Sequence, residues 1–153
     1  MLGGAAVTSD SHDIVLPDPS GSSQARAARL AVERSGIDFS DVVHVNAHAT
    51  STPAGDSGEA RWIAKVLGEQ TVVTATKSMT GHLLGAAGAI EAIATVLSIH
   101  NDLVPPTINL DDPDDEVTVD IARNEARQMP VPAALNNSFG FGGHNAAVLF
   151  RKA

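Results

Sequence analysis

The chain has 153 residues, of which 43% are apolar and only 3% aromatic, which predicts a globular domain with a core of Ala, Val, Ile and Leu. Its net charge is −8 and it has no cluster of Lys or Arg, so nucleic-acid binding is not expected. It contains no cysteine, which excludes thiolate chemistry within these residues and fits a cytoplasmic location. We see no signal peptide and no apolar run of membrane-spanning length, so no membrane association is expected.

The first half of the chain is expected to alternate short strands with amphipathic helices. We predict a strand over 2–8, a helix over 22–35, a strand over 42–48, a helix over 53–67 and a strand over 71–76. In the second helix Ala60, Ile63, Ala64 and Leu67 form the apolar stripe, which leaves Glu59 at the surface.

The second half begins with a helix of a different kind. Apolar residues cover every side of the segment from about Thr80 to His100, so we expect a helix that is buried all round. Its glycines, Gly81, Gly85 and Gly88, indicate close approach of a neighbouring backbone, and its single charge, Glu91, requires a buried partner.

A polar loop and a final strand pair complete the predicted fold. The loop 111–120 carries six carboxylates without the spacing of a calcium loop, and it is expected to be solvated. Two apolar strands within 133–150 flank the segment 139–143. The order of elements indicates one α/β domain over 1–153, with a mixed buried sheet and packed helices.

Two histidines occupy positions where strands or helices meet loops. His44 and His48 are too far apart on a strand, at about 13 Å, to share a metal ion. His48 ends its strand, where sites form in α/β sheets, although it could simply bond a loop carbonyl. His82 is expected at a helix N-terminus, which favours a neutral imidazole, and its alternative role is capping. Lys77 precedes it by five residues and would otherwise be an ordinary surface lysine.

The glycine-rich segment 140–143 allows two interpretations. It is either a hairpin turn or a turn that presents the Phe141 amide to a developing oxyanion. It is not a phosphate-binding loop, because no Gly-Lys-Ser/Thr follows it.

Three segments together resemble the motifs of β-ketoacyl-ACP synthases. They are the histidine segment 45–56, the lysine and second-histidine segment 77–88, and the phenylalanine gate 137–143. The resemblance implies the C-terminal half of a thiolase-like fold from a type II, chain-elongating enzyme, without the N-terminal half that carries the acyl-accepting cysteine. Ala49 replaces a common glycine, so we expect an ordinary negative φ there, and His144 replaces a common threonine.

The resemblance also implies a role for each motif residue in a decarboxylative Claisen condensation. His48 and His82 would stabilise the malonyl-derived enolate, Lys77 would hold the charge pattern around His82, and the Phe141 amide and ring would serve the oxyanion hole and the acyl-channel gate. Thr50 and Thr52 would bind the pantetheine arm, and Phe139, Gly140 and Gly142 would complete the substrate site. Asn46, Glu91 and Asn145 resemble positions that bind a structural Na⁺ or K⁺.

The implied partners are the acyl carrier protein, acyl and malonyl thioesters, the N-terminal ketosynthase half and, for the complete enzyme, a second copy. No cofactor is expected, because phosphopantetheine arrives on the carrier protein. Since a thioester requires a thiolate, the 153 residues alone are expected to be inactive in condensation. The alternatives are a non-catalytic truncated fragment or partner subunit, a polyketide ketosynthase half, and an unrelated α/β binding domain.

Overall fold

The computed structural model describes all 153 residues and confirms the alternation of strands and helices. The elements of the first half are β1 (Leu2–Ser9), α1 (Ser22–Ser35), η1 (Phe39–Asp41), β2 (Val42–Asn46), α2 (Pro53–Leu67) and β3 (Val72–Thr74). Those of the second half are α3 (Lys77–Thr80), η2 (Leu84–Ala86), α4 (Ala87–Asn101), β4 (Leu103–Val104), β5 (Asp120–Ile121), β6 (Arg127–Gln128), β7 (Ala133–Gly140), η3 (Phe141–Gly143) and β8 (His144–Arg151).

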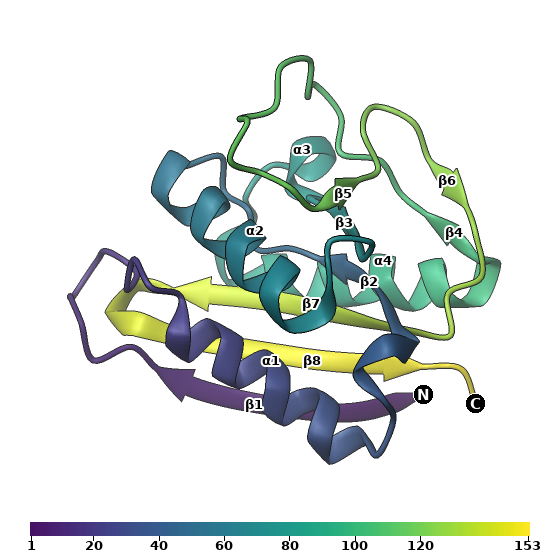
Figure 1. The fold of residues 1–153 in the computed structure, drawn as a ribbon, viewed down its shortest axis with the longest axis horizontal. Coiled ribbons are helices and arrows are strands. Elements are labelled where there is room, and N and C mark those ends of the chain that lie inside the picture. The colour runs from purple at the N-terminus through teal and green to yellow at the C-terminus, as the bar shows by residue number, and fades with distance from the viewer.

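Six strands form one mixed sheet in the order β1-β8-β7-β2-β3-β5 (Figure 1). The predicted final strand pair is the antiparallel hairpin β7–β8, and β1 pairs antiparallel with β8. The strands β7, β2, β3 and β5 run parallel to one another. A mixed α/β sheet is therefore confirmed, and its parallel part brings several strand ends to one edge.

One face of the sheet, here called the α2 face, is covered by α1 and α2 (Figure 1). Alanines of α1, such as Ala27 and Ala28, allow this helix to lie close to the sheet. Ile63 of α2 and Leu135 of β7 are fully buried in the same cluster. This face carries the larger of the two hydrophobic clusters.

The opposite face, here called the α4 face, is covered by α4 together with Val104 of β4 and Val131. The expectation of a helix buried all round is wrong for this chain, because Ile90, Ile93, Val96 and Leu97 of α4 are exposed. Periodicity shows that a helix is apolar on every side, but it does not show which neighbour covers each side.

The expected single helix over 80–100 is also interrupted. Helix α3 ends at Gly81, and a turn with the short η2 precedes α4. Of the three glycines, only Gly88 lies against a neighbour, because a Cβ there would be 2.9 Å from Ser138 Oγ. Nothing lies within 4 Å of such a Cβ at Gly81 or Gly85, so close approach was wrong for both.

The stretch Leu84–Asn101 is long and apolar enough to cross a membrane by length and composition alone, contrary to the expectation that no run reaches that length. The core helix of a folded domain passes the same test, and here one side of α4 packs on β7 and β8. The six-carboxylate loop precedes β5 and is largely exposed, as expected.

Candidate active site

The predicted site residues follow the carboxyl ends of β2, β3 and β7, which meet at one edge because these strands are parallel. His48 lies two residues after β2, and Lys77 begins α3 just after β3. Phe141 follows β7 directly. The topology thus brings together three segments that are far apart in the sequence.

The imidazole rings of His48 and His82 are neighbours at this edge. Their centroids are 5.6 Å apart with the ring planes at 86°, and the ring of Phe139 lies 5.5 Å from that of His48. Burial lowers the pKa of His48 to about 3, and the charges of Lys77 and His82 act in the same direction. His48 is therefore neutral at pH 7 and carries one ring N–H.

His82 lies in the exposed turn between α3 and η2, and not at the start of a long helix as expected. Its Nδ1 accepts a hydrogen bond from the Leu84 N–H at 3.3 Å. In the neutral ring the hydrogen is then on Nε2, which is free to donate. The two histidines can therefore each offer one N–H to a shared acceptor.

Lys77 is buried, and the alternative of an ordinary surface lysine is wrong. Its Nζ lies 2.5 Å from Glu91 Oε1 of α4, and both side chains are almost inaccessible. This ion pair supplies the partner that the buried Glu91 was expected to need. Burial raises the pKa of Glu91, and its hydrogen bond with Lys77 opposes that rise.

Glu59 was assigned to the surface, yet it is buried and supports the His48 loop from behind. Its Oε1 accepts the His48 N–H at 3.0 Å and the Asn137 Nδ2–H at 2.9 Å, and its Oε2 accepts the Ala49 N–H at 3.0 Å. Burial raises the pKa of Glu59, whereas these donors lower it. Position 59 directly adjoins the apolar stripe of α2, the one sequence signal that could have indicated its burial.

The backbone at Ala49 has φ 25°, and at Ser51 φ 65°, so the expectation of an ordinary negative φ at Ala49 is wrong. Positive φ places Cβ close to the following carbonyl oxygen, which costs free energy in any residue except glycine. The carboxylate of Glu59 holds the N–H group of Ala49 itself and that of the preceding His48.

The phenylalanine gate is an exposed turn that the loop after β1 holds in place. Phe141 is 77% exposed, and Gly142 and Gly143 follow it with φ 76° and 73°. The Gly142 N–H donates to Ile14 O and the Asp10 N–H donates to Gly143 O, both at 2.9 Å. This support could not be predicted from the sequence, because the loop after β1 carries no motif.

The remaining predicted substrate residues lie on the two segments that flank His48. Thr50 and Thr52 follow it, with their Oγ1 atoms 3.4 Å apart, and Thr52 is exposed. Gly140 ends β7 and is exposed, one residue after the half-buried Phe139. All five sites proposed for substrate thus lie at or next to the strand ends that carry His48 and Phe141.

The three residues predicted to bind a monovalent cation do not come together. Asn46 and Glu91 lie on the α4 face, where Asn46 Nδ2 donates to Glu91 O at 3.2 Å. Asn145 belongs to the opposite face, because β8 side chains alternate and Ala147 and Leu149 lie in the α2-face cluster. Its Nδ2 donates to Asp10 Oδ1 at 2.6 Å, so Asn145 is not part of such a site.

A different asparagine lies beside Asn46 on the α4 face. Asn136 is the register partner of Asn46, and its Nδ2 donates to Gly88 O at 3.2 Å. The oxygens Asn46 Oδ1, Glu91 Oε2 and Asn136 Oδ1 are buried without a hydrogen-bond partner. Such orphaned oxygens fit a hard cation. No three His, Cys, Asp or Glu side chains are placed to hold a metal ion.

Comparison with known proteins gives consistent matches over the chain. Residues 1–111 match the family model described as "Beta-ketoacyl synthase, C-terminal domain". The chain is 49% identical to the 3-oxoacyl-[acyl-carrier-protein] synthase 2 of Synechocystis sp., over 97% of the chain and 36% of that protein. It is 46% identical to the enzyme of the same name from Vibrio harveyi, over 99% of the chain and 37% of that protein.

Solved ketosynthases share the fold. A beta-ketoacyl synthase from Burkholderia phymatum superposes with a TM-score of 0.94 at 36% identity, over 99% of the chain and 37% of that structure. A type II polyketide ketosynthase, solved with its acyl-carrier protein, gives a TM-score of 0.95 at 34% identity, over 99% of the chain and 38% of that structure. The chain therefore spans little more than a third of these relatives. It belongs to the β-ketoacyl synthase family, with the thiolase-like fold of ketosynthases, and contains the C-terminal domain of that family.

Proposed function

We propose that this chain is the C-terminal catalytic half of a 3-oxoacyl-ACP synthase, which condenses an acyl thioester with malonyl-ACP in fatty-acid chain elongation. The observation that carries the proposal is the pair of adjacent imidazoles, His48 and His82. His48 is held neutral by burial, and the Nδ1 of His82 is occupied, so that both rings have an N–H for one oxygen.

The reaction follows from that pair. Loss of carbon dioxide from the malonyl group leaves an electron pair that is delocalised onto the thioester oxygen, and this oxygen accepts the N–H groups of His48 and His82. The enolate carbon then attacks the acyl thioester, and the oxyanion that forms accepts the Phe141 N–H and the amide of the nucleophilic cysteine in the other half. That attack forms the new C–C bond, and collapse of the tetrahedral intermediate then restores the carbonyl, breaks the C–S bond and releases the cysteine thiolate.

Lys77 and the polar residues of the loop have supporting roles in this proposal. The Lys77 ammonium is placed next to the histidine pair by its ion pair with Glu91, and its charge acts on His48. Thr50 and Thr52 would bind the pantetheine arm, while Phe139, Gly140 and Gly142 would border the acyl channel that the Phe141 ring gates. The exposure of Phe141 is compatible with a movable ring.

The nucleophilic cysteine would come from a partner half. The matched relatives are nearly three times as long as this chain, and the exposed apolar side chains of α4 form a surface suited to a further domain. We propose that a cysteine-bearing N-terminal half packs there, that the complete enzyme is a cytoplasmic homodimer, and that it acts on the acyl carrier protein. A ketosynthase of this fold has been solved in complex with its acyl-carrier protein.

We further propose that the oxygens of Asn46, Glu91 and Asn136 hold a structural Na⁺ or K⁺. Such an ion would satisfy three buried oxygens and stabilise the folded chain by mass action. Unfolding temperatures in KCl should exceed those in choline chloride at equal ionic strength, and Asn136→Ala should remove the difference. Equal temperatures in the two salts would argue against the ion.

A polyketide ketosynthase half is the second candidate, favoured by the fit to a type II polyketide ketosynthase. The fatty-acid assignment is preferred because identity to the 3-oxoacyl-ACP synthases reaches 49%, against 34% for that ketosynthase. A non-catalytic partner subunit is less favoured, because both histidines and Lys77 are present in a coherent arrangement.

The test is a complete enzyme in which the N-terminal part of the Synechocystis relative is fused ahead of Met1 in register. His48→Ala and His82→Ala should each slow malonyl decarboxylation about a hundredfold or more, since each removes a donor to the enolate oxygen. Acyl loading of the cysteine, measured with labelled acyl-ACP, should persist, because the enolate does not exist in that step.

The exposed His100 provides the control, and His100→Ala should leave both steps unchanged. The proposal fails if His48→Ala decarboxylates normally, or if loading and decarboxylation fall together in both histidine variants.

A further inference from the structure

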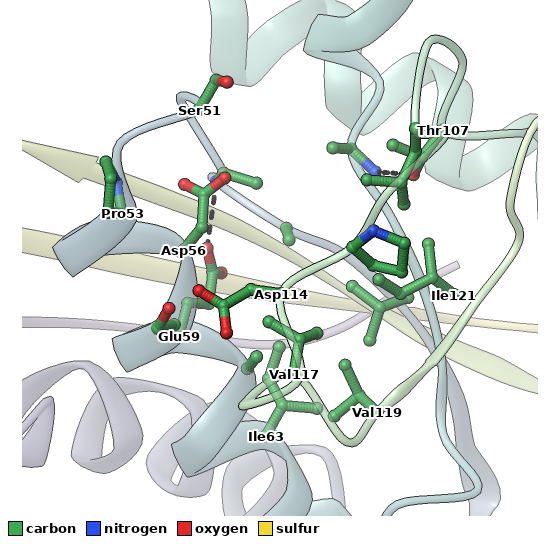
Figure 2. A pocket seen from close by; sticks show the side chains of 18 of the residues that line it. Ser51, Pro53, Asp56, Glu59, Ile63, Thr107, Asp114, Val117, Val119 and Ile121 are labelled. Atoms are coloured by element: carbon green, nitrogen blue, oxygen red, sulfur yellow. Dashed lines mark hydrogen bonds between the residues drawn. The ribbon is translucent and has the colours of Figure 1, made fainter.

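A cavity of about 400 Å³ lies on the far side of the His48 loop, between α2 and the loop 110–119 (Figure 2). Ala49 lines it, whereas His48, His82, Lys77 and Phe141 do not. Apolar side chains from α2, β2, β3 and the segment before and within β5 line its interior: Ala47, Ala60, Ile63, Val73, Val119 and Ile121. The cavity thus excludes the catalytic side chains, but it shares the loop that carries His48, including Thr52 of the proposed pantetheine site.

Carboxylates complete the lining of this cavity. Asp56 and Glu59 come from α2, and Asp112 and Asp114 from the opposite loop. Figure 2 shows the Asp114 side chain extending from the loop towards α2, where Asp56 and Glu59 lie. The three ion pairs of the chain involve other residues, so no Lys or Arg forms an ion pair with these four carboxylates.

Asp56 shows most directly what the cavity lacks. Glu59 is compensated by three N–H donors, but Asp56 Oδ1 is buried without a hydrogen-bond partner. Burial raises the pKa of Asp56, whereas the backbone N–H groups of Thr52, Ser51 and Thr50 and the charge of Lys77 lower it. A buried acceptor without a donor is costly, so a ligand that donates hydrogen bonds would be favoured here.

We propose that this cavity binds a small organic cation with an apolar body, such as an aromatic ring that carries a primary alkylammonium group. The apolar interior accommodates the ring, and the ammonium donates to Asp56 and Asp114. Ala49 lines the cavity and is also fixed by Glu59, so a bound cation contacts the backbone that positions His48.

The test uses the ¹⁵N-labelled 153-residue chain titrated at pH 7 with benzylamine, which is protonated, and with benzyl alcohol as its neutral counterpart. Benzylamine should shift the amide signals of Ala49, Ile63 and Val119 and bind at least about tenfold more tightly than the alcohol, because only the ammonium forms charge-assisted hydrogen bonds. This readout does not depend on condensation activity.

Variants of single carboxylates show which of them bind the ammonium group. Asp56→Asn and Asp114→Asn should each weaken benzylamine about tenfold and leave benzyl alcohol unchanged. Asp115→Asn, in the same loop but outside the lining, should change neither. Ala60→Leu should fill the cavity and abolish the binding of both benzylamine and benzyl alcohol. Dispersed amide signals would show that each variant is folded.

Four outcomes would overturn the proposal. They are equal affinities for the amine and the alcohol, an equal effect of Asp115→Asn and Asp114→Asn, binding that survives Ala60→Leu, and an absence of shifts at Ala49, Ile63 and Val119. Shifts confined to Ile93 and Leu97 would instead assign the amine to the exposed side of α4.

Discussion

The two faces of the sheet each bury a glutamate, but they compensate its carboxylate differently. On the α2 face, Glu59 accepts two backbone N–H groups and one from Asn137. On the α4 face, Glu91 pairs with the Lys77 ammonium through one oxygen, while its second oxygen has no partner. Burial raises the pKa of both carboxyl groups.

The difference extends beyond the two carboxylates. The α4 face also holds the unpaired oxygens of Asn46 and Asn136 and the unpaired Nε2 of His44, and the far side of its helix is exposed and apolar. The α2 face also has unpaired buried oxygens, Asn137 Oδ1 and Asp56 Oδ1, but the apolar side chains of its helices are buried in one large cluster. We infer that the α2 face is stable by itself, whereas the α4 face is arranged for an ion and a further domain.

The largest expected effect comes from breaking the Lys77–Glu91 pair. Glu91→Gln leaves the ammonium of Lys77 buried without a counter-charge, which should lower the free energy of unfolding by about 3–5 kcal/mol. Urea denaturation followed by circular dichroism measures this loss. The double variant Lys77→Met/Glu91→Leu should recover most of it, because both charges are then gone.

The exposed pair Lys152–Asp102 is the control for that measurement. Both of its side chains are more than a third accessible, so Lys152→Ala should cost at most about 1 kcal/mol. Similar losses for Glu91→Gln and Lys152→Ala would remove the basis for treating the buried pair as special.

The second-largest expected effect is the loss of folding stability at low pH, through His44 on the α4 face. His44 is fully buried, its Nδ1–H donates to Val72 O at 3.0 Å, and burial lowers its pKa from 6.5 to about 4. Between these values the unfolded chain binds a proton that the folded chain does not, so stability is lost as pH falls through this window. The loss from His44 is about 3 kcal/mol, at 1.36 kcal/mol for each pKa unit.

His44→Gln should therefore flatten the pH dependence of unfolding between pH 6.5 and 4, whereas the same change at the exposed His100 should not. The raised pKa values of Glu59 and Glu91 act in the opposite direction, since the folded chain then binds protons more readily, and they are common to both variants. An unchanged slope in His44→Gln would show that His44 does not set it.

Much of the fold was predictable from local patterns. The apolar stripe of α2 and the β-branched run of β2 gave the correct elements, because amphipathic periodicity is fixed by one buried face. The interruption of the expected helix at residues 81–86 was not predictable, because a turn between two apolar helical segments leaves the composition unchanged.

The proximity of His48 and His82 was predictable from the motifs that contain them, whereas residues positioned by long-range hydrogen bonds were not predictable. Glu59 was misplaced because its donors lie on the His48 loop and on β7, which no helical period reveals. Asn145 was grouped with Asn46 and Glu91 on resemblance alone, whereas strand alternation on β8 puts it on the other face.

The smallest expected effect is on the α2 face, where N–H donors and not a charged side chain compensate the Glu59 carboxylate. Glu59→Gln replaces one accepting oxygen by an amide NH₂ that faces a donor, which should cost about 1–3 kcal/mol of unfolding free energy. The exposed Glu69→Gln should remain within about 0.5 kcal/mol. Hydrogen exchange adds a local readout, since the Ala49 amide should exchange faster in Glu59→Gln while amides of α4 keep their relative protection. If Glu59→Gln costs as much as Glu91→Gln, then compensation by N–H groups is no less critical than compensation by an ion pair, and the contrast between the two faces is wrong.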